Sequence, residues 1–237
     1  MTAAQRRKLA AVFAATGLAL GAAACSSSAD SGPGTGGGPL SYDRVRSTAL
    51  DLVKNKSTSC PFGLDLAKAT AAAGISGAVA PAVTDGRSVT GNAGDGVPAQ
   101  PWPSGATHPP TMPEMPAIPP NAQITCSYTV GPSTVDIDLL AVSKNDYGVS
   151  TMLPRIQHAG RLSLDQLTRF STDRPSVGQT RLTPGQGTAA VSRIALHGEG
   201  DLVLMLDQNT VGQDAPDPAL AGEPLLRAAE ALAGQIR

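Results

Sequence analysis

The fold of this chain is decided by residues 122–139, which read AQITCSYTVGPSTVDIDL. Apolar side chains occupy alternate positions before and after the Gly-Pro-Ser sequence at 131–133. A period of two is typical of a strand that turns one face toward the core, and glycine and proline favour a turn between two such runs. The segment therefore predicts an antiparallel β-hairpin.

A second hairpin is predicted further along the chain, from residues 189–196 and 202–206. The residues between them read HGEGD, and the two glycines suit a connecting turn. The run at 202–206 reads LVLML and is apolar at every position, which is the pattern of a strand buried on both faces. We expect it to be a central strand, and a further strand is expected around 177–182.

Helical patterns lie before, between and after these strands. Ser163 and Gln166 have the spacing of a capping box that opens a short helical turn, whereas Pro154 is expected to end or kink the helix before it. The order helix, helix, hairpin, helix, hairpin, helix predicts an α+β fold, in which an antiparallel sheet has helices packed on one face. The predicted helices cover residues 41–55, 64–73, 146–153, 163–170 and 224–236.

Residues 76–121 show no periodicity and contain nine prolines between Pro98 and Pro120. A loop of this length inside a domain is normally functional or disordered, and we expect a disordered, proline-rich insertion. Trp102, the only tryptophan of the chain, lies within it. It belongs either to a mobile loop that contacts a ligand or partner, or to a segment that it attaches to the surface of the domain.

The first 24 residues have the composition of an export signal. Three basic residues at 6–8 precede an apolar run at 9–24, and Cys25 follows directly. A basic start, an apolar stretch and small residues before a cut are typical of a signal peptide. A cysteine at that cut predicts a lipid anchor, although Ala22 stands where a lipidation signal usually has leucine. The expected location is therefore the outer face of the plasma membrane.

The segment after Cys25 is dominated by Ser, Gly and Pro. Such a composition predicts a flexible tether, because it offers too little apolar surface to offset the entropy of ordering. We therefore expect a signal peptide at 1–24, a lipidated cysteine and tether at 25–40, and a single domain at 41–237.

The chain has three cysteines, Cys25, Cys60 and Cys126. An odd number in an exported protein needs an explanation, and a lipid on Cys25 leaves one pair. Outside the cytoplasm, Cys60 and Cys126 are expected to form a disulfide. A catalytic thiol pair would show the C-x-x-C spacing, which is absent, and no histidine lies near either cysteine in sequence to suggest a metal site.

Four short sequences follow one another along the chain: CPFGL at 60–64, CSY at 126–128, PGQGTAA at 184–190 and the Leu/Ala-rich helix at 225–236. Their order resembles that of an actinobacterial family of exported lipoproteins of unknown function. The resemblance implies a two-cysteine α+β domain behind a lipidation signal and a tether, supports the disulfide, and supplies no catalytic residues. Two departures are Thr188, where such turns commonly have an acidic residue, and the long insertion between the cysteines.

The charge of the chain argues against nucleic acid as a partner. Residues 25–237 carry 15 basic and 19 acidic residues, a net charge of −4, whereas nucleic-acid-binding domains are usually basic. Five arginines gather between Arg155 and Arg181, Arg161 among them. They form either a solvated face or a contact patch for an anionic lipid or cell-wall polymer.

No sequence motif of a catalytic or phosphate-binding site is present. Asp136 and Asp138 lie two apart on a predicted strand, so both point to one face. Paired carboxylates can bind a hard cation or act as acid and base. The interpretation we prefer is that they are the polar residues of a strand with one wet face.

These patterns together predict a membrane-anchored envelope lipoprotein that binds a ligand or partner without catalysis or a cofactor. Candidate contacts are Trp102, Asp136, Asp138, Arg155 and Arg161. The alternatives are an envelope hydrolase, whose site is assembled from distant residues, and a scaffold for a membrane transporter or sensor. An enzyme requires a concave site with convergent polar groups and a perturbed titratable residue.

Overall fold

The structure is a computed structural model that describes residues 39–209 and 215–236. The expected signal peptide and Cys25 lie outside the described residues, and those described belong to one structural unit. No helix among them is long and apolar enough to cross a membrane. The helices are α1 (Tyr42–Lys54), α2 (Leu66–Ala72), α3 (Gly148–Gly160), α4 (Leu164–Thr172) and α5 (Glu223–Ala233), with a 3₁₀ turn, η1, at Pro218–Leu220.

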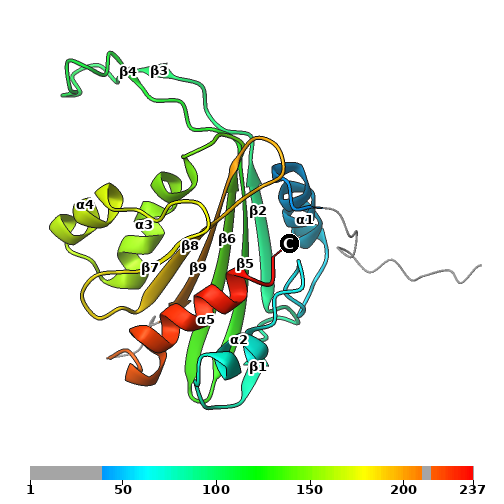
Figure 1. Cartoon of the computed structure of the whole chain (residues 1–237). Helices are drawn as coiled ribbons and strands as arrows, with labels where there is room; N and C mark the ends of the chain where they lie inside the picture. Colours follow the sequence, from blue (N-terminus) through cyan, green and yellow to red (C-terminus); the bar gives the residue numbers. More distant parts are fainter. Residues whose placement is uncertain (1–38, 210–214, 237) are drawn as a thin grey trace, which may run out of the picture. The chain divides into compact units, whose positions relative to one another are not determined.

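The centre of the molecule is an antiparallel sheet in the order β1-β5-β6-β9-β8-β7, and β2 also pairs with β5. The predicted hairpin at 122–139 is confirmed as β5 and β6, and the second hairpin as β8 and β9 (Figure 1). The strands are β1 (Val79–Pro81), β2 (Val89–Gly94), β3 (Gln100–Pro101), β4 (Glu114–Met115), β5 (Asn121–Val130), β6 (Ser133–Val142), β7 (Thr180–Leu182), β8 (Ala189–Ile194) and β9 (Asp201–Gln208).

One face of this sheet is covered by α1, α2 and α5, and we call it the sealed face. Ile137 of β6 and Leu204 of β9 point into it, and both are fully buried. Its contacts are close enough to require glycine at one position: a Cβ on Gly91 of β2 would lie 2.2 Å from the carbonyl oxygen of Ala49 in α1. The disulfide between Cys60 and Cys126, with Cα atoms 5.7 Å apart, lies against this core and is confirmed.

The opposite face, which we call the α3 face, carries a second and smaller apolar core. Val203 and Met205 of β9 alternate with the leucines of the sealed face and pack against Val149 and Met152 of α3. The α+β class and the antiparallel sheet are therefore confirmed, but helices cover both faces rather than one. The physical reason is that β9 is apolar on both sides, so each side needs a cover.

The expectation that residues 76–121 are disordered is corrected by the structure. β1 and β2 add to the free edge of β5, and β3 and β4 form a separate small hairpin that projects from the sheet (Figure 1). β1 and β2 are ordered by backbone hydrogen bonds to β5. Such bonds do not require alternating apolar side chains, so a sequence rich in Gly and Ala, such as VTGNAG at 89–94, shows no hydrophobic period.

The expectation that the helix ends at Pro154 is corrected, since α3 continues through Pro154 to Gly160. Proline removes one backbone hydrogen bond, but the apolar side chains of Met152, Ile156 and Ala159 bury one face of the helix on both sides of it. The capping box at Ser163 and Gln166 is confirmed at the start of α4.

Candidate functional site

A pocket of about 560 Å³ opens on the α3 face, and we call it the α3 pocket. One wall comes from α3 and the other from β5, β6 and the end of β9. Most of the residues that line it have polar side chains, in contrast to the core beside it. The polar side chains that matter below are Gln123, Asp136, Arg155, His158, Asp207 and Asn209.

Three aspartates lie on this face because of strand alternation and register. Asp136 and Asp138 alternate with the apolar residues that β6 turns to the sealed face, and Asp207 is paired directly with Asp136 across β6 and β9. Side chains opposite each other in an antiparallel pair have Cβ atoms roughly 5 Å apart. The carboxyl groups of Asp136 and Asp207 are thus close neighbours.

The hydrogen bonds of these aspartates are incomplete. Thr125 donates to Oδ1 of Asp138 at 2.6 Å, and Oδ2, which has no hydrogen-bond partner within the described residues, forms an ion pair with Arg155. Asn209 donates to Oδ2 of Asp136 at 3.0 Å. Within the described residues, Oδ1 of Asp136 and Oδ2 of Asp207 are buried without a hydrogen-bond partner.

Burial of these groups changes their acidity. It raises the pKa of the Asp207 carboxyl well above its usual value, and the neighbouring charges of Asp138 and Asp136 raise it further, while Arg155 partly opposes them. Burial also raises the pKa of Asp138 to about 6, against the opposing effects of Arg155 and the Thr125 hydrogen bond. Both causes favour the protonated form of Asp207, because ionising it would place another negative charge in a dry acidic cluster.

Arg155 and His158 bring basic side chains to the other wall. They are three residues apart on α3, so they lie on one side of the helix. The guanidinium of Arg155 reaches across to Asp138, and its side chain remains 38% exposed. The same helix thus supplies both an apolar face for the core and a polar edge for the pocket.

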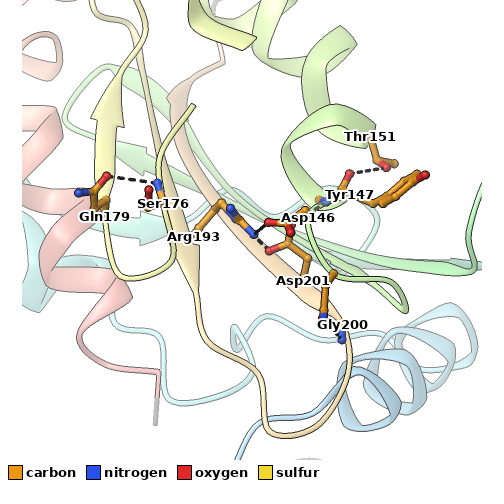
Figure 2. Close-up of polar contacts among 10 residues, drawn as sticks. Asp146, Tyr147, Thr151, Ser176, Gln179, Arg193, Gly200 and Asp201 are labelled. Atoms are coloured by element: carbon orange, nitrogen blue, oxygen red, sulfur yellow. Dashed lines mark hydrogen bonds and ion pairs between the residues drawn. The ribbon is translucent and has the colours of Figure 1, made fainter. Parts of the chain in front are cut away.

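A second polar cluster fixes the start of α3 (Figure 2). Arg193 of β8 is buried and donates to Asp201 at 3.0 Å and to Asp146 at 2.8 Å. The other carboxylate oxygen of Asp201 accepts the backbone N–H of Gly148 at 2.8 Å, at the first residue of α3. These partners satisfy one another, so we assign the cluster a positioning role: it holds α3 over the sheet and thereby sets the pocket wall.

The structure brings together three of the candidate residues and separates the others. Asp136, Asp138 and Arg155 meet at the α3 pocket. The preferred interpretation of the two aspartates as residues of a wet face is corrected, because Asp136 is only 6% exposed and Asp138 is fully buried. Solvent is excluded because α3 covers this face.

Trp102 and Arg161 are not among the residues that line the pocket. Trp102 lies next to β3, stacks on His108 with ring centroids 5.5 Å apart, and donates to the carbonyl of Met112 at 2.9 Å. Arg161 is an exposed residue that follows α3 in the left-handed conformation. Neither is placed to contact a ligand held between Asp136 and Asp207.

Sequence reasoning missed Asp207, Asn209, Gln123 and His158 as site residues. The available signal was the sequence Asp-Gln-Asn at 207–209, directly after the apolar run at 202–206. Polar residues at the end of a central strand lie at the edge of the core, where a site can form. The pairing of Asp207 with Asp136 depends on register, which the sequence does not state.

A larger hollow, of about 750 Å³, lies between β7, β8 and the end of α5, but it lacks unsatisfied groups of this kind. Its two arginines are already paired, Arg181 with Asp173 and Arg193 with Asp146 and Asp201. Among the described residues, no three Asp, Glu, His or Cys side chains are arranged to hold a metal ion. The α3 pocket is therefore the candidate site.

Comparison of the chain with protein-family models, with curated proteins and with solved structures gave no match. The case for a function thus depends on the geometry of the α3 pocket and on the sequence of the chain.

Proposed function

We propose that this chain is an exported lipoprotein, anchored at the outer face of the plasma membrane through Cys25, that binds a small polar ligand in the α3 pocket. The anchor is supported by the sequence alone: a basic start, an apolar run, small residues and then Cys25. It is the reason for placing the protein in the exported lipoprotein family that its short motifs resemble. The binding function is supported by the pocket.

One observation carries the binding proposal. Asp136 and Asp207 each keep a buried carboxyl oxygen without a partner within the described residues, and both line an open pocket. A buried polar group without a hydrogen bond destabilises a fold by roughly 1–3 kcal/mol, and crowded carboxyls add to this. A ligand that donates hydrogen bonds to these oxygens would remove that penalty when it binds.

The test of binding begins with the exported protein extracted from its own membranes. Small molecules released on denaturation are identified by mass spectrometry and titrated back by calorimetry. We expect a polar ligand to bind at one site and to lose at least tenfold in affinity in the Asp136→Asn variant. Asp173→Asn, which changes an exposed carboxylate elsewhere, should bind as the wild type does. Equal affinity in both variants, or the absence of any bound molecule, would contradict the proposal.

The anchor is tested separately by Cys25→Ala. We expect this variant to leave the membrane fraction, and the wild-type N-terminal peptide to carry the mass of an acyl-modified Cys25. A variant that stays in the membrane fraction, together with an unmodified Cys25 in the wild type, would contradict the anchor but would leave the pocket proposal standing.

A hydrolase is the second candidate, and the state of Asp207 favours it. A carboxyl whose pKa is raised can act as a general acid nearer neutral pH, and Asp136 directly beside it could act as the base. The two candidates differ in the fate of the ligand. Recovery of the ligand unchanged after prolonged incubation supports binding alone, whereas conversion that is lost in Asp207→Asn supports catalysis.

A further inference from the structure

The charges around the α3 pocket do not balance. Three carboxyl groups, from Asp136, Asp138 and Asp207, face the guanidinium of Arg155. The ion pair with Asp138 engages that guanidinium, and Asn209 donates to Oδ2 of Asp136. Carboxyl groups thus outnumber the arginine at this point, so an anionic ligand is disfavoured.

The neighbouring side chains do not supply the missing donors. The amide of Gln208 points away from the pocket and donates to the carbonyls of Asp217 and Leu220 at 2.9 and 2.7 Å. The three carboxyls are not arranged as a ligand set for a metal ion within the described residues. Within the described residues no group donates to Asp136 Oδ1 or Asp207 Oδ2, so a ligand that donates to both would complete the site.

We propose that the α3 pocket binds a ligand with a protonated primary amine, and that its ammonium group lies between the carboxyl groups of Asp136 and Asp207. This inference rests on the proposed binding function and adds the chemical class of the ligand. An ammonium offers three donors and no acceptor, and once Asp207 is ionised it can donate to both oxygens that lack a partner. A hydroxyl offers only one donor and brings two lone pairs that the pocket does not need.

Binding of such a cation also favours the loss of a proton from Asp207. Burial and the charges of Asp138 and Asp136 raise the pKa of this carboxyl in the free protein. An ammonium beside Asp207 and Asp136 stabilises the ionised carboxyl and so lowers that pKa. We therefore expect a proton to pass from Asp207 to the buffer as the ammonium binds. The other charged or titratable groups facing this point are Arg155 and His158 of α3.

Matched probes test the inference on the full exported protein at pH 7. Cadaverine and D-glucosamine supply the amine, while 1,5-pentanediol and D-glucose supply hydroxyls on the same skeletons. Each is titrated by calorimetry in two buffers with different ionisation enthalpies, so that proton release is measured directly. We expect at least one amine to bind at least tenfold more tightly than its hydroxyl partner and to release a proton. Asp207→Asn should weaken the amine at least tenfold and abolish proton release, whereas Asp173→Asn should leave both unchanged.

The outcomes separate the inference from the proposed function. If a molecule identified from the membranes binds in the pocket, but the hydroxyl probes equal or exceed the amines, only the amine inference is overturned. The same holds if amines bind equally well to the wild type and to Asp207→Asn. If no molecule of either kind binds, both are overturned. A thermal melt of each variant confirms folding, and Asp207→Asn changes the shape of the side chain very little.

Discussion

Ile137 and Asp138 are neighbours on β6 and both are fully buried, yet they lie in opposite surroundings. Ile137 points into the sealed face, where apolar side chains from α1, α2 and α5 surround it. Asp138 points to the α3 face, where burial opposes its charge and only Arg155 and Thr125 compensate. The comparison shows that one face of a strand can stabilise the fold through apolar packing, while its other face carries buried carboxyl groups that destabilise it.

The largest effect is expected from the disulfide that closes the sealed face. Replacing both Cys60 and Cys126 by alanine should lower the free energy of unfolding by about 4 kcal/mol, because the unfolded chain is released from a loop closed across a sequence separation of 66 residues. Urea titration of the oxidised wild type and the double variant measures this. A loss below about 1 kcal/mol would show that the sealed face does not depend on its cross-link.

A core truncation on the same face should have the next largest effect. Leu204→Ala removes a fully buried side chain of the central strand and should cost about 3 kcal/mol, through lost burial and the cavity left behind. Urea titration with an unchanged slope would confirm a simple loss of stability. An effect below about 1 kcal/mol would mean that the sealed face repacks and is less rigid than its burial indicates.

Asp207→Asn on the α3 face should act in the opposite direction and stabilise the protein. Because the folded-state pKa of Asp207 lies above its unfolded value, the folded protein holds a proton that the unfolded chain releases near pH 4. Stability therefore falls as the pH rises from about 4 toward and through the raised value. The variant should be more stable than the wild type at pH 7, and should differ little from it near pH 4. Urea titrations at several pH values measure this. A variant less stable than the wild type at pH 7 would contradict the claim that the buried Asp207 carboxyl destabilises the α3 face.

A smaller effect is expected from Arg155→Met. It leaves the Asp138 carboxylate buried without its ion pair, which should cost about 1–2 kcal/mol at pH 7, less than a fully buried pair because Arg155 is 38% exposed. The loss should shrink at pH 5, below the Asp138 pKa of about 6, since a protonated carboxyl needs no counter-charge. Asp138→Asn in the same chain should restore most of the loss.

The matched control for that experiment is Arg181→Met. Arg181 also pairs with an aspartate, but its partner Asp173 is 72% exposed. Exposed pairs contribute roughly 0–1 kcal/mol, so the control should change stability by less than the Arg155 variant and show no dependence on pH between 5 and 7. Equal losses in the two variants would mean that the burial of Asp138 has no special consequence.

Most of the fold followed from local pattern. Three local patterns each indicate one type of secondary structure. They are the alternation at 122–139, the apolar run at 202–206 and the Ser163 capping box. What the pattern could not give was the cover of each face. The apolar run at 202–206 indicates that both sides of the strand are buried, but it does not indicate which helices bury them.

The site was less accessible to sequence reasoning, because it is made by pairing rather than by a motif. Asp136 and Asp138 were visible as a pair on one strand, but their burial depends on α3 lying over that face. Asp207 is 71 positions after Asp136 in the sequence and meets it only through the register of β6 and β9. A one-residue slip would turn Asp207 to the sealed face, so no local feature of the sequence could identify the cluster.

The most direct test of this account is a pH titration of the Asp207 side-chain carboxyl by ¹³C NMR, with its resonance assigned by Asp207→Asn. We predict that the free protein shows an Asp207 pKa well above the usual value near 4, and that saturating cadaverine lowers it. An Asp207 pKa near 4 in the free protein would contradict the claim that the α3 face keeps an unsatisfied acidic site.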